Sequence, residues 1–219
     1  MRGIRFTHKL LGSTQVSNDQ KQLIQMSDAC ERQMIAILET ANIGSIEDGC
    51  QELNMVVFLL ENVINAVISQ VMIFLVEKDM HGISKEIGSL SLYGDQIRLQ
   101  QVLSDFLMHV VHHTQSSEGS VEIRVDLISK LIRDGHDFVH LQFRMIHPGQ
   151  GLPLQIVQEM FQGGNKLVSQ EGFGLRATHK ILRNMGGHAQ YIRDPSRLVN
   201  ATFSLTLNFK PLMEQAWNQ

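Results

Sequence analysis

The feature that most constrains the fold is a change in the spacing of apolar residues near the middle of the chain. Between Asp95 and Thr114, apolar residues recur three or four positions apart, which predicts one amphipathic helix. In the segments 121–127 and 139–145, apolar and polar residues alternate, which predicts two half-buried strands. Because a polar loop separates these segments, we expect them to pair antiparallel and to face a common core.

The rest of the chain after residue 50 alternates between short strands and helices. Pro153 suits the first turn of a helix over 152–161, and Gly186-Gly187 is a stop signal for a helix that begins near Gly174. The other expected elements are strands at 53–60, 82–87 and 89–93, a buried helix at 61–76, and a closing hairpin of strands at 189–193 and 202–209. Together they predict an α/β chain of the α+β two-layer type, in which helices cover one face of a mixed sheet.

The first fifty residues have a helical pattern with one apolar stripe. Ser17 followed by Gln20 is a capping-box pattern and predicts the start of a long helix, and residues 3–11 supply a shorter helix before it. The stripe on the long helix consists of Leu23, Met26, Cys30, Met34, Ile37 and Ala41. A lone helical hairpin buries little apolar surface, so we expect a two-fold homodimer that forms a four-helix bundle.

Gly44 and Asp48-Gly49 break the helical period and mark a domain boundary. We therefore divide the chain into a helical-hairpin dimerisation domain at 1–46, an α/β domain at 47–210 and a tail at 211–219. The chain starts abruptly within the first arm of the hairpin, so we expect it to be a fragment.

Composition and charge narrow the classes of function. Hydrophobic residues make up 43% of the chain and charged residues 19%, and both values are typical of globular proteins. The net charge is -3 and the basic residues are scattered singly, so direct nucleic-acid binding is disfavoured. The apolar run at 62–76 is too short and too polar to span a membrane. Cys30 and Cys50 lack metal-ligand or redox spacing, which fits core thiols in a reducing compartment.

Two pairs of glycines are candidates for a ligand site. Gly149-Gln150-Gly151 follows the second alternating strand, and Gly172-Phe173-Gly174-Leu175 stands at the start of a helix. Glycine permits positive φ and close approach of the backbone, and exposed amides at a helix start favour phosphate. With the helix at 95–114 upstream, these segments resemble the nucleotide site of the histidine-kinase ATPase superfamily. In that superfamily asparagines on the helix hold magnesium, an aspartate before the first glycines reads adenine, and the second glycines bracket a lid over the phosphates.

A closer resemblance covers nearly the whole chain. The segments that carry it are 3–11 (GIRFTHKLL), 19–23 (DQKQL), 93–103 (YGDQIRLQQVL), 143–145 (FRM), 148–153 (PGQGLP) and 190–193 (QYIR). They resemble the C-terminal histidine-kinase-related region of plant phytochromes, and they lean toward the E-like branch. The resemblance implies a cytoplasmic and nuclear photoreceptor whose partners are signalling proteins of the light response. It implies no bilin in this chain, since the chromophore attaches to the N-terminal photosensory part.

Matching positions one by one predicts a degenerate ATP site. Two magnesium-binding asparagines of active histidine kinases are replaced by Asp105 and His109, and an imidazole is a poor ligand for magnesium. The adenine-reading aspartate falls at His147, which accepts a hydrogen bond only as a neutral imidazole in one tautomer. The predicted cofactor-binding residues are Asp105, His109, His147, Gly149, Gly151, Gly172 and Gly174.

Two further positions depart from the family pattern. Gln170 replaces the leading glycine of the second pair, and this adds a side chain where the lid folds over phosphate. The phosphoacceptor histidine would lie just upstream of Met1, and His8 is not at that position. We therefore expect weak binding of ATP and magnesium at most, and we assign no catalytic residue.

His109, His112 and His113 share part of one helix and allow two interpretations. Zinc binding through a pair spaced i, i+4 is one. Solvated histidines at a helix end are the other, and we favour them because the sequence offers no third ligand.

Three functions stay open. The first is an output and dimerisation module of a red/far-red photoreceptor, which relays a rearrangement by a population shift. The second is an active ATP-dependent protein kinase acting on serine or threonine, which needs a magnesium site that this sequence has altered. The third is an orthodox histidine kinase, which the missing acceptor disfavours.

Overall fold

The computed structural model divides the chain into two compact units, Met1–Gln51 and Glu52–Gln219. It describes residues 7–8, 10–21, 23–25, 27–28, 31, 53–77, 83–86, 90–114, 120–133, 136–149, 151–161, 169–193 and 200–211. The predicted domain boundary between residues 46 and 47 lies outside the described residues. So does the glycine-containing stretch from which it was predicted.

In the N-terminal unit, the described residues are helical on both sides of a turn. The turn follows Leu10 and Leu11, whose carbonyls accept from the amides of Ser13 and Thr14. A reciprocal capping box then starts the second helical segment: the Gln20 amide donates to Ser17 Oγ at 3.2 Å, and the Ser17 amide donates to Gln20 Oε1 at 2.9 Å. This confirms the predicted cap. Of the predicted apolar stripe, all residues except Leu23 lie outside the described part of the chain.

The C-terminal unit is built on a seven-stranded sheet with the order β1-β3-β7-β5-β4-β2, and β6 pairs with β7 beside this path. The strands are β1 Val56–Leu59, β2 Ile83–Glu86, β3 Ser91–Gly94, β4 Val121–Arg133, β5 His136–Pro148, β6 His188–Arg193 and β7 Asn200–Pro211. Among the described strands, β2 pairs with β4 in parallel and the other pairings are antiparallel. The sheet is therefore mixed, as predicted.

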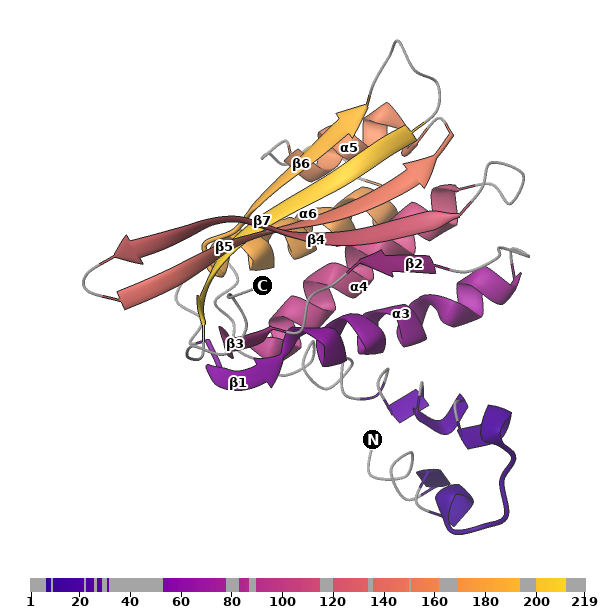
Figure 1. Cartoon of the computed structure of the whole chain (residues 1–219). Coiled ribbons are helices and arrows are strands. Elements are labelled where there is room, and N and C mark those ends of the chain that lie inside the picture. Colours follow the sequence, from indigo (N-terminus) through magenta and orange to yellow (C-terminus); the bar gives the residue numbers. More distant parts are fainter. Residues whose placement is uncertain are drawn as a thin grey trace. The chain divides into compact units, whose positions relative to one another are not determined.

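Four helices accompany this sheet in the described part of the unit: α3 Leu60–Glu77, α4 Gln96–His113, α5 Leu154–Phe161 and α6 Gln170–Asn184. α4 packs against α3 and α6, and α6 packs against α5. Figure 1 shows these helices gathered on one side of the strands. The predicted two-layer arrangement is confirmed for the C-terminal unit.

Local signals fix both ends of α4. Asp95 caps its start, because its carboxylate accepts from the amides of Arg98 and Asn54, each at 3.0 Å. At the other end the Thr114 amide donates to the Val111 carbonyl at 3.3 Å. The bounds match the helix predicted over 95–114. The apolar residues that gave the prediction are buried, namely Leu99, Val102, Leu103, Phe106, Leu107, Val110 and Val111.

The core lies between α4 and the long strands. β4 and β5 pair antiparallel over nearly their whole length, as their alternating sequences predict. From β5, Phe143 is fully buried, and from β7, Phe203 meets Phe106 of α4 edge to face with ring centroids 5.0 Å apart. Helix and sheet are joined by this aromatic contact.

The observed bounds differ from the predicted ones at several element ends, and two of these differences concern the second glycine pair and the predicted tail. α6 begins at Gln170 rather than near Gly174, because Ser169 caps it and its side chain accepts from the Gly172 amide. β7 runs through Pro211, the first residue of the predicted tail, and pairs there with Leu92 of β3. Local propensity predicted that Gly172 precedes α6, whereas capping by Ser169 and packing against α5 keep it inside the helix.

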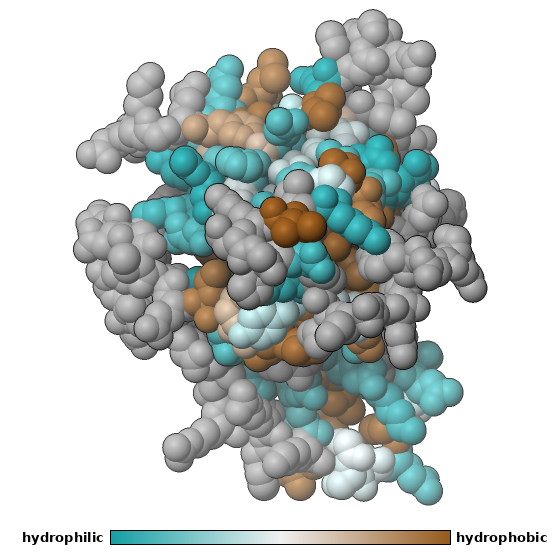
Figure 2. Space-filling model, turned by 60° about the vertical axis from the view of Figure 1, so that its left-hand side comes forward, coloured by the Kyte–Doolittle hydropathy of each residue, from teal (hydrophilic) through white to brown (hydrophobic). Residues whose placement is uncertain are grey.

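The described surface is mixed in character. On the face in Figure 2, apolar side chains form small groups separated by hydrophilic ones. Within the described part of the chain, no helix combines the length and apolar character that a membrane crossing requires.

We predict that Phe106→Ala lowers the free energy of unfolding by about 3–5 kcal/mol, because it leaves a cavity between α4 and β7. The matched control is Ile97→Ala on the same helix, where the side chain is 47% exposed. The control should change stability by less than about 1 kcal/mol. Urea unfolding followed by far-UV circular dichroism measures both, and equal losses would contradict the assigned core.

Candidate functional site

The N-terminus of α6 holds a carboxylate from the chain itself. Ser169 Oγ accepts from the Gly172 amide at 3.0 Å, and the same hydroxyl donates to Glu159 of α5. Glu159 Oε2 also accepts from the Ser169 amide at 3.1 Å, and Gln155 Nε2 donates to Oε1 at 2.9 Å. These hydrogen bonds, led by that of the Ser169 hydroxyl, hold the pKa of Glu159 below its usual range. Glu159 is therefore an anion at the positive end of the helix dipole.

The two glycines of the second pair have different surroundings. A side chain at Gly172 would collide with Glu159, whose Cβ would lie 2.7 Å from the added Cβ. Gly174 is exposed, and an added Cβ there would meet nothing within 4 Å. Close packing of α5 on α6 therefore requires Gly172 and does not require Gly174.

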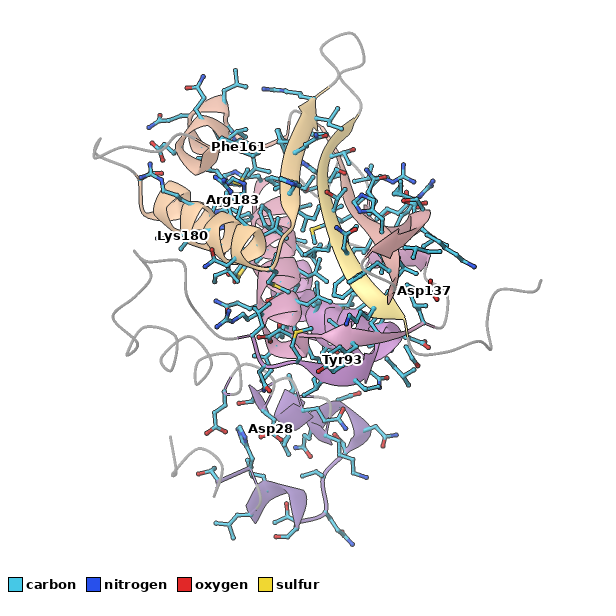
Figure 3. All side chains as sticks on the ribbon, turned by 90° about the vertical axis from the view of Figure 1, so that its left-hand side faces the viewer. Asp28, Tyr93, Asp137, Phe161, Lys180 and Arg183 are labelled. Atoms are coloured by element: carbon cyan, nitrogen blue, oxygen red, sulfur yellow. The ribbon has the colours of Figure 1, made fainter. Side chains whose placement is uncertain are left out.

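The contact between α5 and α6 continues beyond the glycines. Arg176 Nε donates to the Glu159 carbonyl at 3.1 Å, and Phe161 meets His179 edge to face at 5.2 Å between ring centroids. Figure 3 shows Phe161 beside the helix that carries Lys180 and Arg183. α5 and α6 thus form one packed pair around Glu159.

Tyr191 of β6 covers the turn that follows β5. Gly149 and Gly151 adopt φ values of 89° and 75°, which favour glycine. An added Cβ at Gly151 would collide with the Tyr191 hydroxyl and would lie 2.7 Å from the Cβ of Ala201. The Leu152 amide donates to the same hydroxyl at 2.6 Å. Gly151 is therefore required where the turn approaches Tyr191.

His147 lies beneath this turn and is 0% exposed. Its Nε2 is 3.4 Å from the Tyr191 hydroxyl, and its Nδ1 has no hydrogen-bond partner among the described residues. Burial, together with the charge of His113, lowers the pKa of His147 to about 4, so the ring is neutral at pH 7. A neutral ring that donates from Nε2–H to Tyr191 leaves Nδ1 as a buried acceptor.

Asp105 connects α4 to α6. Its carboxylate accepts from the Thr178 hydroxyl at 2.7 Å. Burial raises the pKa of Asp105 to about 6, although the hydrogen bond from Thr178 lowers it. His109 lies one turn further along α4 and is half-buried. Both positions predicted for magnesium are thus on α4, and the Asp105 carboxylate already accepts a hydrogen bond from Thr178.

The predicted site residues lie in separate contacts. His147 lies with Gly151, Gly172 lies against Glu159, and Asp105 holds α6. The residues that the sequence analysis missed are Glu159, Ser169, Thr178 and Tyr191. Only Ser169 has a local signal, because serine is a preferred N-cap residue. The other three act through partners that are distant in the sequence.

For the histidines of α4, the rings of His112 and His113 meet edge to face at 5.1 Å. In the part of the chain that the structure describes, the metal-capable group of three ligands is His8, Asp28 and Glu31 in the N-terminal unit. His109, His112 and His113 do not form such a group with any described residue.

Residues 94–211, more than half of the chain, match the family of histidine kinase-, DNA gyrase B- and HSP90-like ATPases. The chain belongs to this family. Two solved structures, of the histidine kinase AdeS and of ShkA, show the same fold. AdeS of Acinetobacter baumannii superposes with a TM-score of 0.57 at 16% identity over 93% of this chain and 90% of that one. ShkA, solved in complex with AMPPNP, superposes with a TM-score of 0.62 at 17% identity over 95% of this chain and 42% of that one.

Within the ATPase family, the chain is homologous to plant phytochromes, which confirms the predicted resemblance. It is 49% identical over 214 residues to phytochrome E of Ipomoea nil, covering 96% of this chain and 19% of that protein. It is 50% identical over 198 residues to phytochrome B-2 of Glycine max, covering 89% of this chain and 17% of that protein. The chain thus spans less than a fifth of the length of these relatives.

Because the pKa of Asp105 is raised, we predict that Asp105→Asn stabilises the C-terminal unit and that this stabilisation depends on pH. Between pH 3.8 and about 6 the folded state keeps a proton that the unfolded state has lost, so stability falls as pH rises through this window. Asparagine accepts from Thr178 without a charge. We expect Asp105→Asn to raise the free energy of unfolding by about 1–3 kcal/mol at pH 7 and by much less at pH 4.

Urea unfolding of the natural chain and of Asp105→Asn, each at pH 7 and at pH 4, measures this difference in stability. His147 has the opposite slope, because its unfolded form binds a proton between about pH 4 and 6.5 that the folded form does not. This slope is common to both proteins and cancels in the comparison. Thr178→Val is the matched control, since it removes the hydrogen bond and leaves the carboxylate, and it should destabilise the domain at pH 7. A pH-independent effect of Asp105→Asn would contradict the assigned titration.

Proposed function

We propose that this chain is the output and dimerisation module of a red/far-red photoreceptor, with an ATPase-like domain that transmits a conformational signal. Homology to plant phytochromes supports the photoreceptor assignment. The main support for a loss of phosphotransfer is the position of Glu159, because its carboxylate occupies the N-terminus of α6. Signalling then depends on a shift between arrangements of the module, and it needs no chemical step.

Side chains of the protein itself occupy the phosphate end of the proposed site. The ATPase resemblance assigns the start of α6 to the phosphates, because helix N-termini bind anions. Here Ser169 and Glu159 already satisfy that end, and Glu159 is negatively charged. A triphosphate at this position would be repelled by the carboxylate and would have to break its hydrogen bonds. The phosphate end therefore does not fit a nucleotide in the described arrangement.

The base and metal ends of the proposed site are also engaged by contacts within the protein. Tyr191 packs on the Gly151 turn, and His147 below it is fully buried, so the adenine-reading position is covered. Asp105 holds Thr178, and His109 supplies a nitrogen where magnesium prefers oxygen. The residues at these ends also do not fit bound ATP and magnesium, and we derive no reaction step through them.

One observation favours the second candidate, an ATP-dependent protein kinase acting on serine or threonine. The unpaired Nδ1 of His147 is a neutral acceptor, and the amino group of adenine is a donor that could satisfy it. Displacement of Tyr191 would be needed to expose it. The nucleotide analogue in the ShkA complex supports the capacity of this fold to hold such a ligand.

We further propose a homodimer formed through the N-terminal helical hairpin, cytoplasmic and nuclear location, and signalling proteins of the light response as partners. The dimeric bundle follows from the predicted apolar stripe, and the location and partners follow from the phytochrome homology.

We expect calorimetric titration of the purified chain with magnesium-ATP to give no binding, or a Kd weaker than about 1 mM. Glu159→Ala removes the competing anion and should strengthen binding. His109→Asn combined with His147→Asp restores the family residues and should also strengthen it. Glu61→Ala, which removes an exposed glutamate from α3, is the matched control and should have no effect. Micromolar affinity of the natural chain would favour the kinase.

The dimer has its own test. We expect Ile37→Asp to convert the dimer into monomers in sedimentation equilibrium, because a charge would enter the predicted apolar stripe. Ile37 lies outside the described residues, so the variant tests the sequence pattern directly. An unchanged dimer would rule out the stripe as the interface.

A further inference from the structure

We infer that His8, Asp28 and Glu31 form a site for one divalent transition-metal ion in the N-terminal helical unit. Each residue contributes one potential ligand atom, and these atoms all lie within 4.8 Å of one another. No other group of three or more such ligands occurs among the described residues. None of these residues is among those proposed for ATP.

The capped turn brings these residues together. His8 is on the helical segment before the turn, and Asp28 and Glu31 follow it on the second segment. Residues spaced i, i+3 share one face of a helix, so Asp28 and Glu31 can turn toward one point. His8 Nδ1 contacts Asp28 Oδ1 across 20 residues of chain. Asp28 is labelled in Figure 3.

The two carboxylates of this cluster favour a cation. Glu31 is 2% exposed, and the side chains of His8 and Asp28 are 11% and 38% exposed. Two carboxylates that approach each other repel, and a divalent ion bound by both would reduce that repulsion.

The second nitrogen of His8 is held as in many metal sites. Ser27 Oγ lies 2.8 Å from His8 Nε2. A histidine that ligates a metal through one nitrogen commonly donates from the other to an oxygen, which fixes the ring and its tautomer. Without a metal, the contact between Nδ1 and Asp28 Oδ1 is a hydrogen bond that holds a proton. When Nε2–H donates to Ser27, the lone pair of Nδ1 is available to a metal, and an ion bound by Nδ1 and Asp28 would replace that proton and separate the two atoms.

The ligand set selects the class of metal. One imidazole nitrogen with two carboxylate oxygens suits zinc and its neighbours, whereas magnesium and calcium prefer oxygen alone. Three protein ligands leave a coordination position for water. A bound ion would clip the two helical segments together, so it would stabilise the hairpin that we assign to dimerisation.

The test is calorimetric titration of the EDTA-treated chain with zinc chloride alone. We expect one zinc ion per chain with a Kd of about 1 μM or lower. The result should be the same when Cys30 and Cys50 are both replaced by serine, which excludes thiol ligands. Ser27→Ala should weaken binding about 10-fold, and His8→Ala and Asp28→Asn should weaken it at least as much. Saturating zinc should raise the thermal midpoint of the natural chain and not that of His8→Ala.

The control is His188→Ala, which removes an exposed histidine from β6 and should bind zinc as the natural chain does. Asp28→Asn keeps the size of the side chain and an acceptor for His8, so it decides the question even if His8→Ala fails to fold. Absence of zinc binding by the natural chain, unchanged binding by Asp28→Asn, or equal affinity for magnesium would overturn the inference.

Discussion

The C-terminal unit depends on the burial of one face of α4 against β5 and β7. Phe106 of the helix meets Phe203 of the sheet, and Phe143 lies in the same core. Because interiors are packed to crystal-like density, this contact fixes the position of the helix as well as its stability. Asp105 is next to Phe106 in the sequence. Burial of Phe106 in the core therefore directs Asp105 toward α6, where it meets Thr178. The core of α4 thus determines which polar groups can meet.

In the region that we propose as a degenerate nucleotide site, these polar groups bind other groups of the protein. Glu159 accepts hydrogen bonds at the start of α6, Tyr191 covers the first glycine turn and Asp105 accepts from Thr178. Each contact is a hydrogen bond that the protein makes with itself. Such a domain is held in one arrangement by its own side chains. That property suits a relay, because a signal can act by breaking these contacts.

The buried groups carry opposite pH dependences. Asp105 is protonated more readily in the folded state, and His147 less readily. Their contributions to stability partly cancel between about pH 4 and 6. The N-terminal unit contains another, partly buried, group of titratable side chains at His8, Asp28 and Glu31, which we propose as the ligands of a metal ion.

The sequence by itself determined which helices and strands form in the C-terminal unit, with bounds close to the observed ones. The apolar period predicted α4 and the β4–β5 hairpin, and a capping-box pattern predicted the start of the second N-terminal helical segment, because these signals act within a few residues. Local signals placed α6 four residues too late, since packing keeps Gly172 inside the helix. Only the tertiary structure decided that Glu159 reaches Ser169, that Tyr191 covers His147 and that His8 meets Asp28. An apolar period specifies which face is buried, but it does not specify which distant side chain lies opposite, and that depends on how whole elements pack.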